Sequence, residues 1–383
     1  MKVLYASERP PYPFFLGGAA RCAHELLVRL ASEPGIECIA VGSAAFDHPP
    51  WNYPAEESYS SLGINEIRED RDRRVVDCGY PVQVLDDFPN ALDDLAGQFL
   101  PDVIWTQMEG AQQVAAFAKR TKIPSLYFIH DAELPSSELK ALAKLGCGFV
   151  ASSHFLAQKS RRFLKQSIGT VYPCPRLDFG VSGAPDGYIT MINPHRVKGV
   201  ETFYAIARRR PDVKFLLLES WKLKDGDLQD LRKHLEELPN VEFRYRVSDM
   251  AMIYAETRLL LVPSIWEEGF GMVVVEAQSC GIPVIASNRG GLPESTGEGG
   301  MLIDDFKNPS AWIEAMHAIL DDPAIYRLYA ERAMLNAQRN VFDCSYSASV
   351  FRQVIEEVVK RGCNRGNVLR RVKNVLTGIF SRE

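Results

Sequence analysis

The stretch PSIWEEGFGMVVVEA, residues 263–277, decides the fold of the chain around it. The largely apolar run Arg258–Val262 predicts a strand, which Pro263 ends because proline cannot donate to the ladder of a central strand. Gly269 and Gly271 predict a turn that lets the backbone approach a ligand, and the helix that follows begins with N–H groups that lack an intrahelical partner. Such a helix start can bind an anion, and a diphosphate is the ligand that we expect there.

Two carboxylates flank this predicted anion site. Glu268 and Glu276 lie eight positions apart, one before the helix and one within it. Because like charges would repel a phosphate, we expect both to face neutral hydroxyls, with Glu276 on a ribose diol and Glu268 on a bound sugar. For an isolated pair of glutamates, two solvated acids are the competing interpretation.

The motif continues in order through Gly281-Ile282-Pro283-Val284 and Gly290-Gly291-Leu292-Pro293-Glu294. The whole stretch resembles the family 4 retaining glycosyltransferases, whose pattern is a glutamate, Gly-Phe-Gly, a second glutamate, a helix and then Gly-x-Pro-Val. The resemblance implies an α/β GT-B fold, in which two Rossmann-like domains with parallel sheets face a central cleft. It also implies that the C-terminal domain holds most of a nucleotide sugar.

Composition sets the broad class of the protein. The 383 residues, 46% of them hydrophobic, suffice for two domains with a core each, and a net charge of −5 speaks against a nucleic-acid partner. The eight cysteines show no Cys-x-x-Cys spacing, which argues against zinc or a disulfide framework and favours a reducing compartment. No apolar run approaches the ~18–20 residues of a membrane span, and the N-terminus reads directly as a strand, so we expect a cytoplasmic protein.

Short apolar strands alternate with helical periodicity in two series, as βαβ units require. Residues 1–175 form the predicted acceptor-side domain, 176–187 a linker, and 188–362 the nucleotide-sugar-binding domain. Residues 44–74 carry few periodic cues and predict a long loop. The expected strands are 2–6, 36–41, 102–106, 125–129 and 148–151 in the first series and 188–192, 213–218, 241–245, 258–262 and 283–286 in the second.

Gly17 and Gly18 follow the first strand, where a tight turn is their simplest role. In the resembled family a glycine pair here forms the N-terminal wall of the cleft beside the donor phosphates. That family usually reads Gly-Gly-x-Glu, whereas this chain reads Gly17-Gly18-Ala19-Ala20 and then Arg21. The glutamate is replaced, and acceptor recognition is the property that we expect to differ.

His130 follows the predicted strand 125–129, at the carboxyl end where open α/β sheets bind ligands. A lone histidine is often structural, but the resemblance implies that this one contacts the donor sugar and the leaving phosphate. Gln107 follows the strand 102–106, where many relatives carry another histidine. Gln107 and Glu109 are therefore acceptor-side candidates.

In the second half, Lys198 and Gly199 match the resembled pattern Gly-Arg-x-x-x-x-Lys-Gly, and the lysine would offset diphosphate charge. Asn193 replaces the usual arginine, so Arg196 either supplies the missing cation or is a solvated loop residue. Residues 241–248 resemble the family's base-binding strand end, which implies that backbone atoms near Arg246 read the nucleobase. The remaining donor-binding candidates form the turn and helix start: Gly269, Phe270, Gly271, Met272 and Val273.

The triplet Asp225-Gly226-Asp227 has the Asp-x-Asp form that holds Mn²⁺ or Mg²⁺ in GT-A enzymes. It lies in a polar stretch before a helical pattern and predicts a turn and an N-cap. We therefore expect neither a metal nor a cofactor other than the nucleotide-sugar co-substrate.

The last part of the chain predicts two helices. Residues 346–361 are expected to continue the helices of the C-terminal domain. Residues 366–383 carry an apolar stripe flanked by arginines and a lysine, and we expect them to pack back on the N-terminal domain. Peripheral contact with an anionic membrane is the alternative.

Combined with the charges of the site, the resemblance implies a retaining, metal-independent hexosyltransferase that moves a sugar from a nucleoside diphosphate to a saccharide or lipid-linked acceptor, in polysaccharide or glycolipid assembly. A UDP-sugar is favoured, with UDP-glucose as the default donor. Glu268 would orient the sugar, His130 would hold it from the opposite domain, and Lys198 would stabilise the leaving diphosphate. The alternatives are a nucleotide-sugar epimerase of the same fold, which needs acid and base carboxylates in the N-terminal domain, and a catalytically silent scaffold, which the loss of arginine at Asn193 favours.

Overall fold

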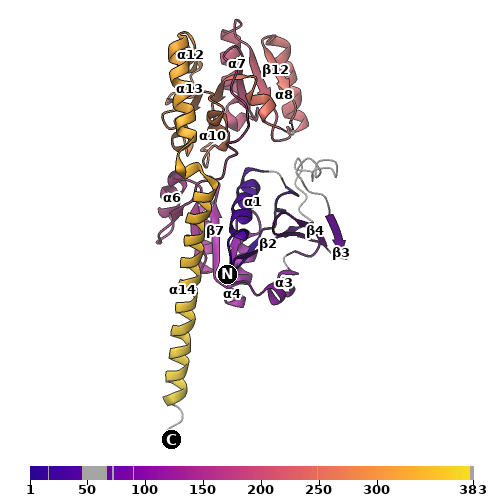
Figure 1. Ribbon diagram of the computed structural model, residues 1–383, viewed down its shortest axis with the longest axis vertical. Coiled ribbons are helices and arrows are strands. Elements are labelled where there is room, and N and C mark those ends of the chain that lie inside the picture. Colours follow the sequence, from indigo (N-terminus) through magenta and orange to yellow (C-terminus); the bar gives the residue numbers. More distant parts are fainter. Residues whose placement is uncertain (16, 45–66, 71–72, 89, 248, 380–383) are drawn as a thin grey trace.

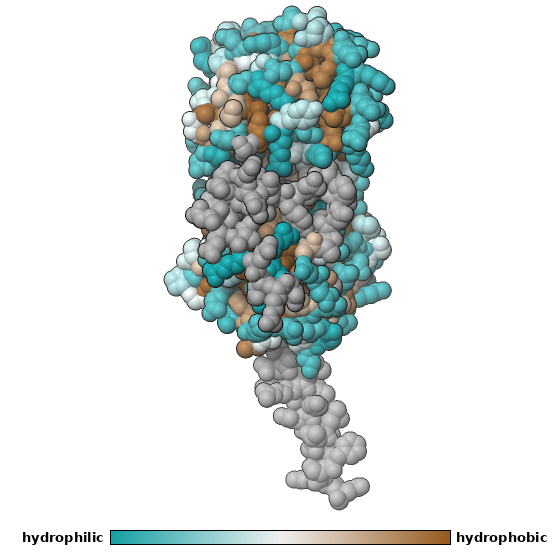
Figure 2. Space-filling model, turned by 90° about the vertical axis from the view of Figure 1, so that its right-hand side faces the viewer, coloured by the Kyte–Doolittle hydropathy of each residue, from teal (hydrophilic) through white to brown (hydrophobic). Residues whose placement is uncertain are grey.

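The computed structural model describes residues 1–15, 17–44, 67–70, 73–88, 90–247 and 249–379, without the side chains of 67, 69, 70 and 363–379. Figure 1 shows two α/β domains stacked along the long axis, with the last helix running beside the N-terminal domain. Each domain is built on a largely parallel sheet, as the sequence predicts. Hydrophilic side chains cover much of the surface seen in Figure 2, and hydrophobic ones reach the surface in patches over the C-terminal domain.

The N-terminal domain has a nine-stranded sheet with the order β3-β4-β5-β2-β1-β6-β7-β8-β9. The strands from β5 to β9 pair in parallel, and the order runs outward from β1 in both directions. The carboxyl ends of β1 and β6 therefore form a topological switch point, where open α/β sheets bind ligands. The elements are β1 (Lys2–Ala6), α1 (Gly18–Ala31), β2 (Glu37–Ser43), β3 (Ile67–Asp70), β4 (Arg73–Asp77), β5 (Pro81–Leu85), α3 (Leu92–Phe99), β6 (Val103–Thr106), α4 (Ala111–Thr121), β7 (Ser125–Ile129), α5 (Ser136–Lys144), β8 (Gly148–Ala151), α6 (His154–Arg161) and β9 (Gly169–Thr170).

The C-terminal domain has a six-stranded parallel sheet with the order β12-β11-β10-β13-β14-β15, the arrangement of a Rossmann fold. Its central strands are buried on both faces, which explains why they read as continuous apolar runs. The carboxyl ends of β10 and β13 form its switch point. The elements are β10 (Tyr188–Ile192), α7 (Val200–Arg209), β11 (Phe215–Leu218), α8 (Asp225–Glu237), β12 (Val241–Arg244), α9 (Ala251–Tyr254), β13 (Thr257–Val262), α10 (Met272–Ser279), β14 (Val284–Ser287), α11 (Leu292–Thr296), β15 (Gly300–Ile303), α12 (Pro309–Leu320), α13 (Pro323–Ala337) and α14 (Cys344–Ile379).

Each predicted strand is present, with ends that differ by at most two residues. The predicted loop 44–74 is wrong at its end, because β3 and β4 form an antiparallel hairpin that extends the sheet beyond β5. Charged residues fill this edge hairpin and hide its alternation, as is common where an edge strand must avoid pairing with other chains. Residues 45–66 of the predicted loop lie outside the described residues.

Helix α14 returns to the N-terminal domain earlier than the sequence predicts. Phe351 and Ile355 are fully buried in the N-terminal core, and the Phe351 ring lies 4.6 Å from Trp105 and 5.7 Å from Phe128, measured between centroids. The assignment of residues 346–361 to the C-terminal domain is therefore wrong. An apolar stripe shows that a helix is amphipathic but does not show which domain it covers.

The ribbon of α14 continues past the N-terminal sheet (Figure 1). The side chains of 363–383 are not described, so the packing of residues 366–383 stays a prediction. None of the described helices is long and apolar enough to cross a membrane.

Glu294 in α11 joins the two domains. Its carboxylate accepts hydrogen bonds from the backbone N–H groups of His154 (2.8 Å) and Phe155 (2.6 Å) and from the Tyr172 hydroxyl (2.8 Å). Because His154 and Phe155 begin helix α6, a residue of the C-terminal domain caps a helix of the N-terminal domain. An ion pair between Lys159 and Glu267 adds a second link between the domains.

Candidate active site

A cavity of about 510 Å³ lies between the two domains. Its lining comes from loops that follow β1 and β7 in one sheet and β10 and β13 in the other, so both switch points open into it. Most of the predicted site residues line it: Gly17, Gly18, His130, Lys198, Glu268, Gly269, Phe270, Gly271, Met272, Val273 and Glu276.

Lys198 and Glu268 form an ion pair at the C-terminal wall of the cavity, with 2.7 Å between Nζ and Oε1. Each side chain is only 13% exposed. The Ser264 hydroxyl donates to the same carboxylate oxygen at 2.8 Å, and the Lys198 ammonium lies 4.6 Å from the centroid of the Trp221 ring. The pair is thus held in place from several sides before any ligand arrives.

Gly199 explains why these two loops meet. It adopts a left-handed φ of 84°, and a Cβ at this position would collide with the carbonyl group of Pro263. Only glycine lets the loop after β10 approach the loop after β13 so closely. This contact sets Lys198 against Glu268.

Asn193, where the sequence departs from the resembled pattern, has a structural role in this chain. It adopts a left-handed φ of 64°, which asparagine tolerates better than most residues, and its Oδ1 accepts hydrogen bonds from Ser220 N (3.1 Å) and Trp221 N (2.6 Å). Asn193 therefore fixes the loop that carries Trp221, on which Lys198 rests.

Helix α10 begins at the floor of the cavity. Gly271 precedes it with φ 92°, no side chain caps its first N–H groups, and its first turn contains no acidic residue. Gly269 allows the turn to touch the opposite domain, because a Cβ there would collide with the carbonyl group of His130. The uncapped helix start offers hydrogen-bond donors and a partial positive charge to an anion.

Glu276 lies within α10 and is 9% exposed. The Tyr254 hydroxyl donates to Oε2 of Glu276 at 3.1 Å. Burial raises the pKa of Glu276, while the charge of Arg21 and the hydrogen bond from Tyr254 oppose the rise. A carboxylate in this position can accept the two hydroxyls of a ribose.

His130 lines the cavity from the N-terminal wall. Its Nε2 lies 2.9 Å from Oε1 of Gln107, whose Nε2 donates to the carbonyl oxygen of Ala19 at 2.9 Å. The Ala19 carbonyl only accepts, so Gln107 Oε1 must accept from His130, and the Nδ1 of His130 keeps a lone pair. Burial lowers the pKa of His130 to about 3, and the ring is therefore neutral at pH 7.

Two acceptor-side candidates lie outside the cavity lining. Gln107 is 1% exposed, with both ends of its amide engaged, so it positions His130 from behind. Glu109 accepts from Arg9 Nε at 2.8 Å, and it is Arg9, not Glu109, that reaches the cavity.

Two predicted donor-side arginines also lie outside the lining. Arg246 is exposed near the end of β12. Arg196 is an exposed residue that forms ion pairs with Asp230 (3.3 Å) and Glu201 (3.8 Å), away from the cavity. Arg196 therefore does not stand where the arginine missing at Asn193 would stand. The turn and N-cap predicted for the triplet Asp225-Gly226-Asp227 fall slightly too late in the chain, since Lys224 takes the N-cap position and the triplet forms the first turn of α8.

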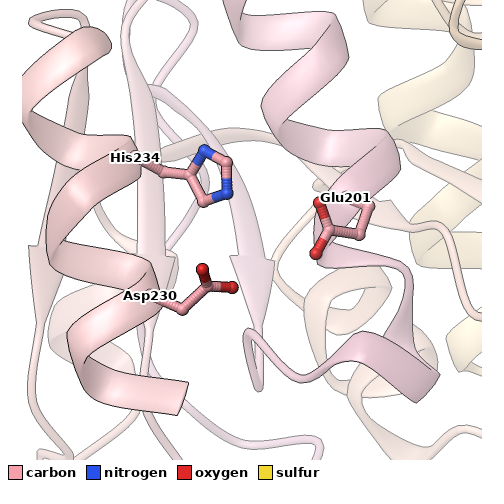
Figure 3. Close-up of side chains that lie close together, drawn as sticks. All are labelled: Glu201, Asp230 and His234. Carbon is pink, nitrogen blue, oxygen red and sulfur yellow. The ribbon is translucent and has the colours of Figure 1, made fainter. Parts of the chain in front are cut away.

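Among the described residues, one cluster could hold a metal ion: Glu201, Asp230 and His234, whose possible ligand atoms lie within 4.8 Å of one another. Figure 3 shows Asp230 and His234 on one helix facing Glu201 on the next. The Arg196 guanidinium already pairs with both carboxylates and offsets one of their two negative charges without an ion.

Sequence reasoning missed several cavity residues. Arg21 lies in the segment where the family's glutamate is replaced, and Trp221 lies in a segment with no predicted role; Asp131 follows His130 at the predicted ligand-binding end of the strand 125–129 but has no predicted role of its own. Arg21 carried a usable signal, because it is a cation in the first turn after a predicted phosphate-binding glycine pair. Trp221 carries no such signal in the sequence, because only the folded structure brings its loop next to Lys198.

Two Rossmann-like domains with a cavity between their switch points define the GT-B class. Residues 188–322 match the family described as "Glycosyl transferases group 1". The sucrose-phosphate synthase of Thermosynechococcus elongatus superposes with a TM-score of 0.73 at 18% identity, covering 94% of this chain and 100% of that one. HepE of Anabaena, solved in complex with UDP-glucose, gives a TM-score of 0.72 at 18% identity, with coverage of 94% and 100%. The protein therefore has the GT-B fold.

Curated relatives match over shorter stretches. The D-inositol 3-phosphate glycosyltransferase of Corynebacterium glutamicum (strain R) is 40% identical over 101 residues, which cover 24% of each chain. Spore coat protein SA of Bacillus subtilis (strain 168) is 32% identical over 124 residues, which cover 30% of this chain and 33% of the relative. The chain thus spans between a quarter and a third of the length of these relatives.

Proposed function

We propose that the protein is a glycosyltransferase that moves a sugar from a nucleoside diphosphate to an acceptor hydroxyl with retention of anomeric configuration. The observation that carries the proposal is one cavity in which Lys198, the start of α10 and the buried Glu276 lie opposite His130. The match of residues 188–322 and the fold support it. A UDP-sugar is the favoured donor, with UDP-glucose first, and the acceptor is a saccharide or a lipid-linked hydroxyl.

The C-terminal wall binds the nucleotide. Glu276 accepts hydrogen bonds from the ribose hydroxyls, and the N–H groups that begin α10 donate to the diphosphate. The diphosphate draws Lys198 toward itself, and Glu268, whose partner is then shared, turns to the hydroxyls of the sugar. This exchange of partners gives the diphosphate a cation and leaves the Glu268 carboxylate hydrogen-bonded.

Transfer breaks the bond between the anomeric carbon and the diphosphate oxygen and forms a bond from that carbon to the acceptor oxygen on the same face. Lys198 and the helix start stabilise the negative charge that develops on the departing diphosphate. The departing oxygen takes the proton of the acceptor hydroxyl. His130 stays neutral and holds a sugar hydroxyl through Nδ1, so it positions the donor without adding charge.

Positive charge for the leaving group comes from Lys198 and backbone dipoles, so the reaction needs no metal ion or cofactor. Activity is expected to survive saturating EDTA. Loss of activity with chelator and recovery on adding Mn²⁺ would contradict this part of the proposal.

The test is to measure UDP or GDP release from a panel of UDP- and GDP-sugars, with UDP-glucose first, in the presence of saccharide acceptors. Product anomers are then assigned by NMR. We expect nucleotide release that depends on the acceptor, with retained configuration. A protein that binds neither UDP nor GDP in a thermal-shift titration would refute the proposal, and binding without turnover would indicate the silent scaffold.

A further inference from the structure

Arg21 is the cation of the cavity whose charge is not balanced. It lies in the first turn of α1, is exposed and lines the cavity. The other cations that line the cavity have carboxylate partners: Lys198 pairs with Glu268 and Arg9 with Glu109. The guanidinium of Arg21 forms neither a hydrogen bond nor an ion pair with any residue that the structure describes, although its charge acts on Glu276 across the cleft.

Its place in the helix is electrostatically unfavourable. The first turn of a helix carries partial positive charge and favours acids, and α1 has no acidic residue there. A second cation stands nearby: although Arg246 is exposed as a whole residue, its guanidinium loses part of its hydration, and this desolvation and then the charge of Arg21 lower its pKa. An anion in the cavity would relieve both repulsions.

Two helices begin near Arg21 in the cavity. Helices α1 and α10 begin on opposite walls of the cavity, and a Cβ placed on Gly18 would lie 3.8 Å from Sδ of Met272. A dianion between them would touch the first turn of both helices. Arg21 stands on one side of that position.

We propose that Arg21 binds the diphosphate of the nucleotide from the N-terminal wall and supplies the cation that the C-terminal wall lacks at Asn193. The inference rests on the proposed function and deepens it, since it names the residue through which the N-terminal domain recognises the donor. The diphosphate then bridges the two domains. The competing role for Arg21 is to balance the charge of Glu276 alone.

The experiment compares two probes on each variant: UDP and uridine, or GDP and guanosine if GDP binds more tightly. Calorimetric titrations are done on the wild type and on Arg21→Ala, Arg21→Lys and Arg196→Ala. Arg21→Ala is expected to weaken diphosphate binding about ten- to a hundredfold, as for a hydrogen bond to a charged group, and to leave nucleoside binding unchanged. Arg21→Lys keeps the charge but loses the planar fork, so its loss should be smaller.

Arg196→Ala is the matched control, because its guanidinium is paired outside the cavity, and we expect wild-type affinity. The melting temperature of ligand-free Arg21→Ala should equal or exceed that of the wild type, because an unfavourable charge is removed. Unchanged diphosphate affinity in Arg21→Ala overturns the inference, and so does an equal loss of diphosphate and nucleoside binding, which would assign Arg21 to Glu276. Failure of the wild type to bind any of the probes would instead refute the proposed function.

Discussion

The two walls of the cavity differ in how their charges are balanced. On the C-terminal wall each charged group already has a partner, as Lys198 has Glu268 and Glu276 has Tyr254. On the N-terminal wall His130 is neutral and Arg21 has no carboxylate partner among the described residues. The difference suggests that the C-terminal wall is organised before the ligand arrives, whereas the N-terminal wall is completed by the ligand.

The walls also differ in how they are built. The C-terminal wall comes from loops of one domain, but the N-terminal wall rests on the end of the chain. The Phe351 ring of α14 lies against Phe128, and Phe128 stacks on His130 with 4.2 Å between centroids. A single aromatic ring thus separates the C-terminal helix from the candidate catalytic histidine.

The largest effect is expected from Phe351→Ala, which removes this support. Truncating a buried phenylalanine costs about 3–5 kcal/mol, so the free energy of unfolding in urea should fall by that amount. Tyr346→Ala is the control, since this ring of the same helix is 48% exposed and its loss should change stability by less than about 0.5 kcal/mol. Equal stability of the two variants would show that the N-terminal wall does not depend on α14.

Lys198→Ala tests the C-terminal wall, where Lys198 and Glu268 are paired before a ligand binds. It removes the cation expected at the leaving group and leaves the buried Glu268 without its partner, so kcat should fall about 10²–10³-fold. Steady-state kinetics with saturating donor measure this. If Lys198→Ala loses no more activity than Arg196→Ala, Lys198 has no role in the reaction.

Glu276→Ala is expected to have a smaller effect, on binding. Loss of the ribose contact should weaken UDP or GDP about ten- to a hundredfold, or about 1.5–3 kcal/mol. Glu276→Gln keeps one acceptor oxygen and should lose less. Titrations that give wild-type affinity for both nucleotides would remove Glu276 from the donor site.

The smallest effect concerns pH. The folded-state pKa of His130 is about 3, below its unfolded value of about 6.5, so His130 contributes stability above pH 6.5 that is lost as the pH falls toward 3. Because the residue is only partly buried, the loss should be less than the about 1.4 kcal/mol per pH unit of a fully buried histidine. Melting temperatures between pH 7 and pH 5 should therefore fall more steeply for the wild type than for His130→Gln. Parallel curves would mean that His130 takes up a proton as easily in the folded protein as in the unfolded chain, and would contradict its lowered pKa.

The sequence predicts the C-terminal wall better than the N-terminal wall, for a physical reason. Residues 263–277 hold a strand end, a turn and a helix start in one continuous segment, so local rules suffice to place Glu268 and Glu276 near an anion site. On the N-terminal wall, Gln107 and His130 come from separate strands and Phe351 from the end of the chain. Which of them meet depends on the sheet order, and no local pattern encodes that.

Single departures from the family's pattern do not predict what the replacing residue does. Asn193 was read as a lost cation, yet its left-handed backbone and two accepted hydrogen bonds give it a role that arginine could not fill. Arg196 lies only three positions after Asn193, and this short spacing suggests that it replaces the missing arginine. Its pairing with Asp230 and Glu201 depends on how α7 packs beside α8, which the spacing does not reveal.

The hydrogen bonds of Glu294 to helix α6 can report when the cleft opens. The first two amides of α6 donate to a carboxylate of the other domain, so any motion that separates the domains removes these two hydrogen bonds, at a cost of about 1 kcal/mol, and leaves only the Ser153 cap on Leu156. The amide protons of His154 and Phe155 exchange with water only when this contact breaks. The rate of hydrogen exchange at these two positions therefore reports how often the cleft opens. A slower rate with nucleotide bound would show that the nucleotide stabilises the closed state.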